Sequence, residues 1–287
     1  MSGLGLDRAL EPLRRLAGEA LFARVAGPNG PAERVRIHDS PGTRWFGADR
    51  PIRVVHGDAS MFVGGLRALL LQSLHPLAMA AVAAHSGYRG DPWGRLQRTS
   101  TFLATTTFGT AEHAQAAVDR VRGIHQAVRG TADGGETYHA ADPHLLAWVH
   151  VAEVDSFLLA HRRYGQHPLD QAGYDGYVAD TARVASALGV VDPPRDQAEL
   201  AERLASFRPE LRSTGPARDA ARFLLLTPPI PLPVRVPYAV LAANALASLP
   251  PWARSLLRVP DLPGLEGPLV RGAGRCLVGS IRWALAA

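Results

Sequence analysis

MFVGGLRALLLQSLHPLAMAAVAA, residues 61–84, is the most apolar stretch of the chain and is long enough to cross a lipid bilayer as one helix. Arg67, Gln72 and His75 interrupt it, and Pro76 removes a backbone hydrogen-bond donor near its middle. These residues favour a buried, kinked central helix over a membrane span. We therefore expect no stable membrane insertion.

The sequence on both sides of this stretch repeats its apolar residues with the helical period, and strict alternation over a strand length is hard to find. Asp91 and Asp142 each precede a proline, which is the order typical of a helix N-cap and the first helical residue. Residues 34–55 favour a loop with at most one short hairpin, and the proline-rich residues 224–238 favour an extended crossover. Helices are expected at residues 3–25, 59–74, 76–86, 92–108, 111–129, 142–164, 170–188, 197–207, 215–226, 235–247, 251–257 and 265–284.

The chain is long and apolar enough, with 287 residues of which 47% are hydrophobic, to bury one sizeable core. We expect an all-α fold: a single-domain helical bundle over residues 1–287 with its core motifs at 55–165. Helices within residues 235–287 are expected to pack on this core.

Charge and cysteine content exclude several classes of protein. All 31 basic residues are arginine, and they are dispersed among acids, so the formal charge of +5 does not indicate nucleic-acid binding. The single cysteine, Cys276, excludes an internal disulfide or a thiolate cluster and is expected to be a small core residue. The N-terminal leucines are interrupted by charges, which favours an amphipathic helix over a signal peptide and a cytoplasmic protein.

A histidine interrupts an apolar helical stripe in VRGIHQAVRG, residues 121–130. Val118, Val121, His125 and Val128 share one helix face, so the imidazole of His125 points toward the core. A lone histidine in this position is more often a hydrogen-bonded core residue than a metal ligand. Periodicity alone leaves both readings open.

Two further helices place polar residues on one face. In residues 92–108, Arg95, Arg98, Thr99 and Phe102 share a face, which is either a solvated stripe or the wall of an internal cavity. In residues 142–164, the following residues share a face: Leu146, Val149, His150, Glu153 and Phe157. His150 and Glu153 can hydrogen-bond to one another across one turn, and Asp155 is out of phase with both.

Other catalytic patterns are missing from the sequence. The Glu-x-x-His spacing of a di-iron site occurs only at 136–139, within a glycine-rich loop, and there is no phosphate loop, nucleophile elbow or His-Glu-x-x-His zinc motif. A single imidazole in an apolar helical pocket with arginines nearby is compatible with haem, whose iron takes an axial histidine and whose propionates bind arginine.

Three blocks of the chain resemble successive motifs of the rubber oxygenase (latex clearing protein) family and its MpaB-type oxygenase relatives. These blocks are LHPLAMAAVAAHSGYRGDPWGRLQRTSTFLATTTFGT (74–110), VRGIHQAVRG (121–130) and YHAADPHLLAWVHVAEVDSFLLA (138–160). The resemblance covers residues 55–165, with a weaker helical remainder to about residue 250. It implies an all-helical fold around haem b, with iron held by one axial histidine.

The resemblance also implies roles for individual residues. His125 matches the axial ligand of the iron, and the residues expected to bind the cofactor are His125, His150, Arg129 and Phe102. Arg95, Arg98 and Thr99 match the catalytic motif of the opposite haem face. Arg98 stands where the family has a lysine, and an arginine rarely coordinates a metal, so an open or water-bound distal site is expected.

The function that the resemblance implies is a haem-dependent oxidoreductase of secondary metabolism. It would be an oxygenase that uses dioxygen or peroxide on an apolar, isoprenoid-like small molecule in a pocket lined by Met79, Phe102 and Leu103. A dehydrogenase or peroxidase is an alternative reaction. A non-catalytic haem-binding or haem-sensing protein and a metal-free protein that binds a hydrophobic ligand are alternative functions. The oligomeric state is left open, with a homo-oligomer among the alternatives.

Overall fold

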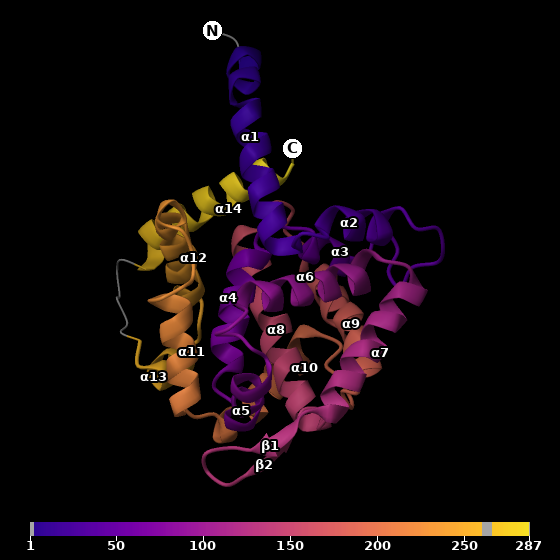
Figure 1. Cartoon of the computed structure of the whole chain (residues 1–287), viewed down its shortest axis with the longest axis vertical. Helices are drawn as coiled ribbons and strands as arrows, with labels where there is room; N and C mark the ends of the chain where they lie inside the picture. The colour runs from indigo at the N-terminus through magenta and orange to yellow at the C-terminus, as the bar shows by residue number, and fades with distance from the viewer. Residues whose placement is uncertain (1–2, 260–265, 287) are drawn as a thin grey trace.

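The structure is a computed structural model that describes residues 3–259 and 266–286, with side chains described from residue 10 to 259 and from 267 to 286. These residues form fourteen α-helices and one hairpin of two short strands, which confirms the expected all-α fold (Figure 1). The elements are α1 (Gly3–Ala26), α2 (Gly30–His38), α3 (Pro51–His56), α4 (Met61–Gln72), α5 (Pro76–His85), α6 (Pro92–Phe108), α7 (Ala111–Ala127), β1 (Arg129–Thr131), β2 (Thr137–His139), α8 (Pro143–Tyr164), α9 (Gln171–Leu188), α10 (Gln197–Ser206), η1 (Arg208–Glu210), α11 (Gly215–Leu225), η2 (Leu232–Val234), α12 (Arg235–Ala247), α13 (Pro251–Leu257), η3 (Glu266–Val270) and α14 (Arg271–Leu285).

Most helix ends lie within two residues of the positions predicted from the sequence. Local capping explains this agreement, because the Asp91 carboxylate accepts a hydrogen bond from the Gly94 N–H and the Asp142 carboxylate accepts one from the His144 N–H, both at 2.8 Å. Each acid is followed by proline at the first helical position. Residue 265, the expected start of the last helix, lies outside the described residues.

The predictions for two segments are wrong. Residues 34–55 were expected to be a loop, but α2 ends at His38 and α3 begins at Pro51, each with a proline in its first turn. Both helices are too short to show a helical period. The antiparallel hairpin β1–β2, with Arg129 opposite His139, was missed because three-residue strands are too short to show alternation.

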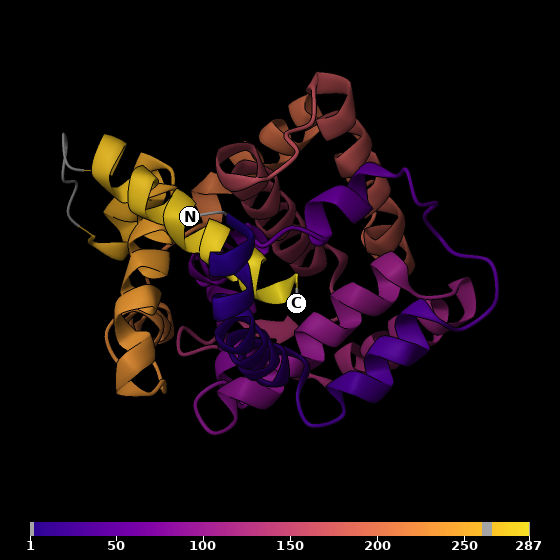
Figure 2. The same ribbon diagram turned by 90° about the horizontal axis from the view of Figure 1, so that it is seen from above.

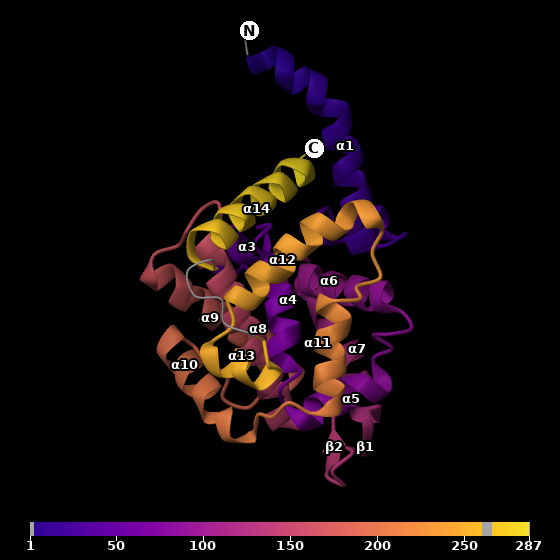
Figure 3. The same cartoon turned by 90° about the vertical axis from the view of Figure 1, so that its left-hand side faces the viewer.

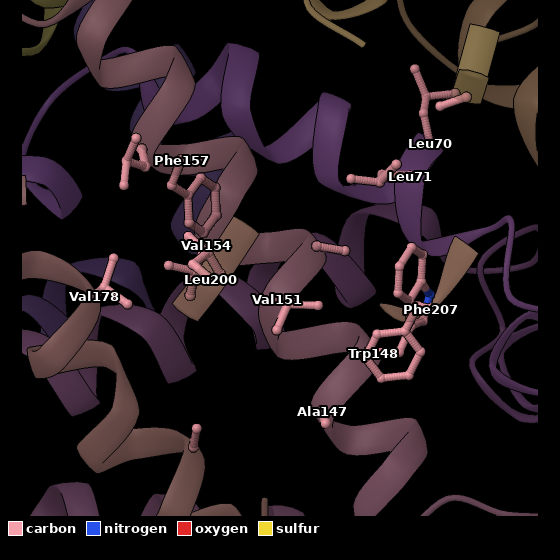
Figure 4. Close-up of a cluster of buried hydrophobic side chains, with 14 of the residues drawn as sticks. Leu70, Leu71, Ala147, Trp148, Val151, Val154, Phe157, Val178, Leu200 and Phe207 are labelled. Carbon is pink, nitrogen blue, oxygen red and sulfur yellow. The ribbon is translucent and has the colours of Figure 1, made fainter. Parts of the chain in front are cut away.

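The centre of the molecule is the pair α4 and α8, which lie side by side and make the most extensive helix contact among the described elements (Figure 1). Trp148 of α8 is fully buried and packs against Phe207, with ring centroids 5.3 Å apart (Figure 4). Gly64 permits the close approach, because a Cβ atom there would lie 2.7 Å from Cδ1 of Phe157. The apolar stretch of residues 61–84 is therefore part of the main core.

This apolar stretch is broken more sharply than a kink, since α4 and α5 meet at 108°. No helix among the described residues is by itself long and apolar enough to span a membrane. Two bent pairs of helices reach that length and composition only when their members are taken together, at Met61–Gln72 with Pro76–His85 and at Leu232–Ala247 with Pro251–Leu257.

Arg67 is a charged residue in the core beside α8, with only 3% of its surface exposed. Its guanidinium forms an ion pair with Asp155 at 2.7 Å and donates hydrogen bonds to Ser156 Oγ at 2.6 Å and to the Ser248 carbonyl at 3.0 Å. The charge is thus compensated on several sides, as a buried arginine requires. Asp155 uses a different face of α8 from Glu153, in agreement with its phase in the sequence.

The remaining helices cover this centre from two sides. The antiparallel helices α6 and α7 and the adjacent α9 lie on one side, and α11 to α14 lie on the other (Figures 1 and 2). Helix α12 packs against α4 in the view of Figure 3, and α1 projects from the body beside α14. Cys276 of α14 is exposed, contrary to expectation, because the buried stripe of that helix passes through Gly274, Val278 and Ala284.

Candidate active site

Helix α8 carries His150 and Glu153 on one face. Because Asp142 caps the start of the helix, it sets the direction in which these side chains point. His150 and Glu153 lie one turn apart and retain part of their accessible surface, although most neighbouring residues of α8 are fully buried. Burial raises the pKa of Glu153 to about 7 and lowers the pKa of His150 to about 4. Both side chains are therefore held in a poorly solvated environment that disfavours their charged forms.

The His150 imidazole is not satisfied by the neighbouring acid. Its Nε2 atom is buried and has no hydrogen-bond partner in the part of the chain that the structure describes. No hydrogen bond joins it to Glu153 in these residues, so the local pairing that the sequence allowed is not formed through Nε2. A buried ring nitrogen without a partner is unfavourable, which makes His150 available to a ligand.

A second histidine, His56, is half-buried at the end of α3 and links α6 to α9. Its Nδ1 lies 2.8 Å from Thr107 Oγ1 and its Nε2 lies 3.2 Å from the hydroxyl of Tyr177. Burial lowers the pKa of His56 to about 3, so the ring is neutral and uses one nitrogen as a donor and the other as an acceptor. Its tautomer then sets the direction of both hydrogen bonds.

The His56 group extends to the face of α8. The His56 ring meets Phe157 edge-on, with ring centroids 5.6 Å apart. Burial raises the pKa of the Tyr177 hydroxyl, and the negative charge of Glu153 raises it further. The tertiary structure therefore brings together Thr107, His56, Tyr177 and Glu153 as one buried polar group.

The sequence identified Glu153 on α8 as a candidate site residue and did not identify the other three members of this group. Tyr177 lies on a buried stripe of α9 with Tyr174 and Val178, so helical periodicity could have found it. His56 could not be found in this way, because the short helix α3 was itself missed.

His125 lies at the C-terminal end of α7, at the margin of the core. Val118 is the only fully buried member of the stripe that the sequence predicted, whereas Val121, His125 and Val128 are half-buried. The imidazole borders a pocket of about 190 Å³ lined by Arg122, His125, Gln126, Ala141, Leu188 and Gly189. This volume is below the range typical of cofactor pockets.

The electrostatic state of His125 suits a ligand atom. Burial lowers its pKa, which favours the neutral imidazole that metals bind. Its Nδ1 atom is buried and has no hydrogen-bond partner among the described residues. No hydrogen bond or ion pair in this part of the chain joins His125 to His150.

The predicted arginine face of α6 is divided between surface and interior. Arg98 forms an ion pair with Asp91 at 3.2 Å while 64% of its side chain is exposed, and Thr99 donates a hydrogen bond to the Arg95 carbonyl from an exposed position. Arg95 is half-buried, and its guanidinium donates a hydrogen bond to Ser86 Oγ at 3.3 Å. No described carboxylate forms an ion pair with Arg95, and burial lowers its pKa. Arg95 is therefore better placed than Arg98 to receive an anionic group.

The other expected site residues are dispersed. Phe102 is half-buried on α6, whereas Arg129 is exposed on β1. Met79 is buried in a cluster with Tyr88 and residues of α11, and Leu103 packs against the main core. Packing of the protein itself therefore already occupies much of the apolar surface of Met79 and Leu103.

Comparison with known proteins identifies the family to which this chain belongs. Residues 53–283 match the family model described as ER-bound oxygenase mpaB/B'/Rubber oxygenase, catalytic domain. The chain is also 28% identical over 174 residues to the uncharacterized protein Mb2261 of Mycobacterium bovis and to the uncharacterized protein Rv2237 of Mycobacterium tuberculosis. Each alignment covers 58% of this chain and 67% of the relative. No solved structure matches the chain.

Proposed function

The chain belongs to the family of mpaB and rubber oxygenase catalytic domains, and we propose that within this oxygenase family it is a haem b-dependent enzyme that oxidises an apolar small molecule. Membership supports oxygenase activity in general, with dioxygen and an organic substrate. The haem, the use of dioxygen rather than peroxide, and the isoprenoid-like class of substrate are the finer parts of the proposal.

The observation that carries the proposal is the neutral, unpaired imidazole of His125 beside a pocket. A second imidazole, His150, and the half-buried guanidinium of Arg95 support it, because the described residues offer no hydrogen-bond partner to His150 Nε2 and no acidic partner to Arg95. An imidazole that binds iron and an arginine that binds a propionate are the contacts that haem requires from a protein. These side chains fit haem in the chemistry of their donor atoms, and the pocket of about 190 Å³ beside His125 would have to widen to hold it.

Each residue would have a distinct role in this enzyme. His125 would hold the iron, with His150 as the next candidate, and Arg95 would bind a carboxylate of the cofactor or a polar atom of the substrate. Haem, when bound, supplies the iron that activates dioxygen or peroxide. Arg98 and Thr99 lie one turn or less from Arg95 on α6 and would complete the polar edge of the site once Arg98 leaves Asp91.

The buried acid provides a means of holding a proton near the site. Because its pKa is raised to about 7, Glu153 changes between its protonated and ionised forms near neutral pH. The negative charge of Glu153 acts on Tyr177, which is hydrogen-bonded to His56, and His56 is in turn hydrogen-bonded to Thr107, so these hydrogen bonds join α9 to α6 through α3. We expect this group to supply or accept protons during the oxidation.

The first test is the absorption spectrum of protein produced with ample iron and haem precursor, together with a pyridine haemochrome assay. His125→Ala is expected to lose most of its haem and its Soret band, while the exposed-site control His167→Ala keeps both. Full haem and an unchanged spectrum in His125→Ala would contradict the axial assignment, and loss in His150→Ala alone would transfer it to His150.

The same preparation separates the alternative functions. Haem that binds without consumption of oxygen or peroxide in the presence of isoprenoid substrates would indicate a haem-binding or haem-sensing protein. A folded, colourless protein would indicate a protein that binds a hydrophobic ligand without a metal. Loss of turnover with retained haem in Arg98→Leu would place Arg98 in the reaction, whereas loss of haem would make it a propionate ligand.

A further inference from the structure

We propose that His75, His144 and Glu210 form a Zn²⁺-binding site that is separate from the haem site and independent of the proposed function. His75 is the N-cap residue of α5, His144 lies in the first turn of α8, and Glu210 ends η1. One ligand atom from each of the three lies within 4.8 Å of the other two. Three segments far apart in the sequence thus present ligand atoms to one point.

The distances suit a small divalent cation. His144 Nε2 lies 3.0 and 2.8 Å from the two carboxylate oxygens of Glu210, and His75 Nε2 lies 3.4 Å from the nearer one, Oε2. In a tetrahedral zinc site with bonds of about 2.0–2.2 Å, neighbouring ligand atoms are about 3.3 Å apart. Only small side-chain movements would therefore be needed to admit the ion.

The state of His75 gives an independent reason to expect a ligand. The residue is 2% exposed, and its buried Nε2 atom makes no hydrogen bond within the described residues, although it points at Glu210 Oε2 from 3.4 Å. Its other nitrogen, Nδ1, accepts a hydrogen bond from the Ala78 N–H at 3.4 Å, which is long. A cation at Nε2 would place the ring proton on Nδ1, so binding would sacrifice this long bond and gain a coordinate bond at the unpaired atom.

Aromatic rings hold the two imidazoles in place. The His144 ring lies on Phe207 with centroids 4.7 Å apart, and the His75 ring lies 6.2 Å from Trp148. His144 and Glu210 are about half exposed, so an ion can enter from solvent and a water molecule can be its fourth ligand. Two imidazoles, one carboxylate and an open position form a donor set that binds Zn²⁺ well.

The charges around the cluster permit a cation. Burial is the main cause that lowers the pKa of His75, Arg212 adds a smaller effect of the same sign, and the guanidinium of Arg212 is paired with Glu136 at 2.6 Å. The neutral imidazoles and the single carboxylate of Glu210 would leave one positive charge on a bound Zn²⁺, which the open side exposes to water. Occupancy would fasten the starts of α5 and α8 to η1, and α8 carries His150 and Glu153 further along.

The test uses the full chain without an added histidine tag, stripped of metal with a chelator and then titrated with Zn²⁺ in a calorimeter. One equivalent is expected to bind, with affinity at least tenfold weaker in His144→Ala and in Glu210→Gln. The control His167→Ala, an exposed histidine outside the cluster, should bind as the unchanged protein does. Both test residues are substantially exposed, so these variants should fold even if His75→Ala does not.

Two further measurements make the outcome decisive. Zn²⁺ should raise the Tm of the unchanged protein and of His167→Ala but not of His144→Ala, and Co²⁺ should give the visible absorption of a site with nitrogen and oxygen ligands. Equal Zn²⁺ binding in the unchanged protein and His144→Ala, or no binding at all, would overturn the proposal. Haem content measured in the same samples shows separately whether the haem proposal fails.

Discussion

Helix α8 borders two regions that differ in whether their polar groups have hydrogen-bond partners. Toward α4, the Arg67 guanidinium contacts Asp155, Ser156 and the Ser248 carbonyl, and the Trp148 indole donates a hydrogen bond to the Gln72 carbonyl at 3.1 Å. On the stripe with Glu153, the Nε2 atom of His150 has no described partner. The paired groups help to specify the core, whereas the unpaired nitrogen of His150 carries a desolvation cost that no described partner offsets.

The largest expected effect lies in the paired region. Trp148→Ala should destabilise the protein by about 5 kcal/mol, the upper end for a buried aromatic residue, because it removes contacts with Phe207 and His75 and leaves a cavity. Urea unfolding measures this change. Val149→Ala, at a position 37% exposed, is the matched control and should lose less than about 1 kcal/mol. Similar losses in both variants would show that α8 is not anchored through Trp148.

The next effect tests the pairing of Arg67. Arg67→Ala should lower the free energy of unfolding by about 3 kcal/mol, because the Asp155 carboxylate loses its cationic partner and the Ser248 carbonyl loses a hydrogen-bond donor. The double variant Arg67→Ala with Asp155→Ala should recover part of this loss, which equilibrium unfolding can measure. Additive losses would mean that the pair is not coupled, and the contrast between the two regions would then disappear.

The smallest effect lies in the unpaired region and depends on pH. The pKa of Glu153 is about 7 in the folded protein and near 4.5 in the unfolded chain, so the unfolded chain releases this proton first as pH rises. The contribution of Glu153 to stability therefore falls between pH 4.5 and about 7. Glu153→Gln should equal the unchanged protein near pH 4 and exceed its stability by up to about 3 kcal/mol at pH 8.

This measurement needs haem-free protein and a comparison at each pH. His56 and His150 have lowered pKa values and change stability in the opposite direction, with stability falling as pH drops from about 6.5. The difference between Glu153→Gln and the unchanged protein removes their contribution. A pH-independent difference, or the same profile in the exposed-site control Glu202→Gln, would show that Glu153 is not held in a desolvated site.

The sequence predicted well what is decided locally. The caps at Asp91 and Asp142 set the starts of α6 and α8, and the phase of α8 separated Asp155 from His150 and Glu153. Cys276 shows the limit of such reasoning, because its exposure depends on which stripe of α14 faces the core.

Features that depend on tertiary contacts could not be predicted in this way. The hydrogen bonds of His56 to Thr107 and Tyr177 form only because α3 packs against α6 and α9. The proposed zinc ligands likewise come from three separate segments of the chain. The pairing of Arg98 with Asp91 also arises from a helix start and not from the helical face alone. The roles predicted for Arg95, Thr99 and His125 remain predictions.

The contact between α4 and α8 has a further consequence for how this protein can diversify. The contact between α4 and α8 closes a long segment of the chain that contains α5, α6, α7 and the hairpin. The hydrogen bond from Trp148 to the Gln72 carbonyl joins residues 76 positions apart across this segment. Lengthening such a segment adds little to the entropic cost of closing it, about 0.6 kcal/mol for each doubling of its length. The fold can therefore tolerate changes of length in this part of the chain while the α4–α8 pair stays the same.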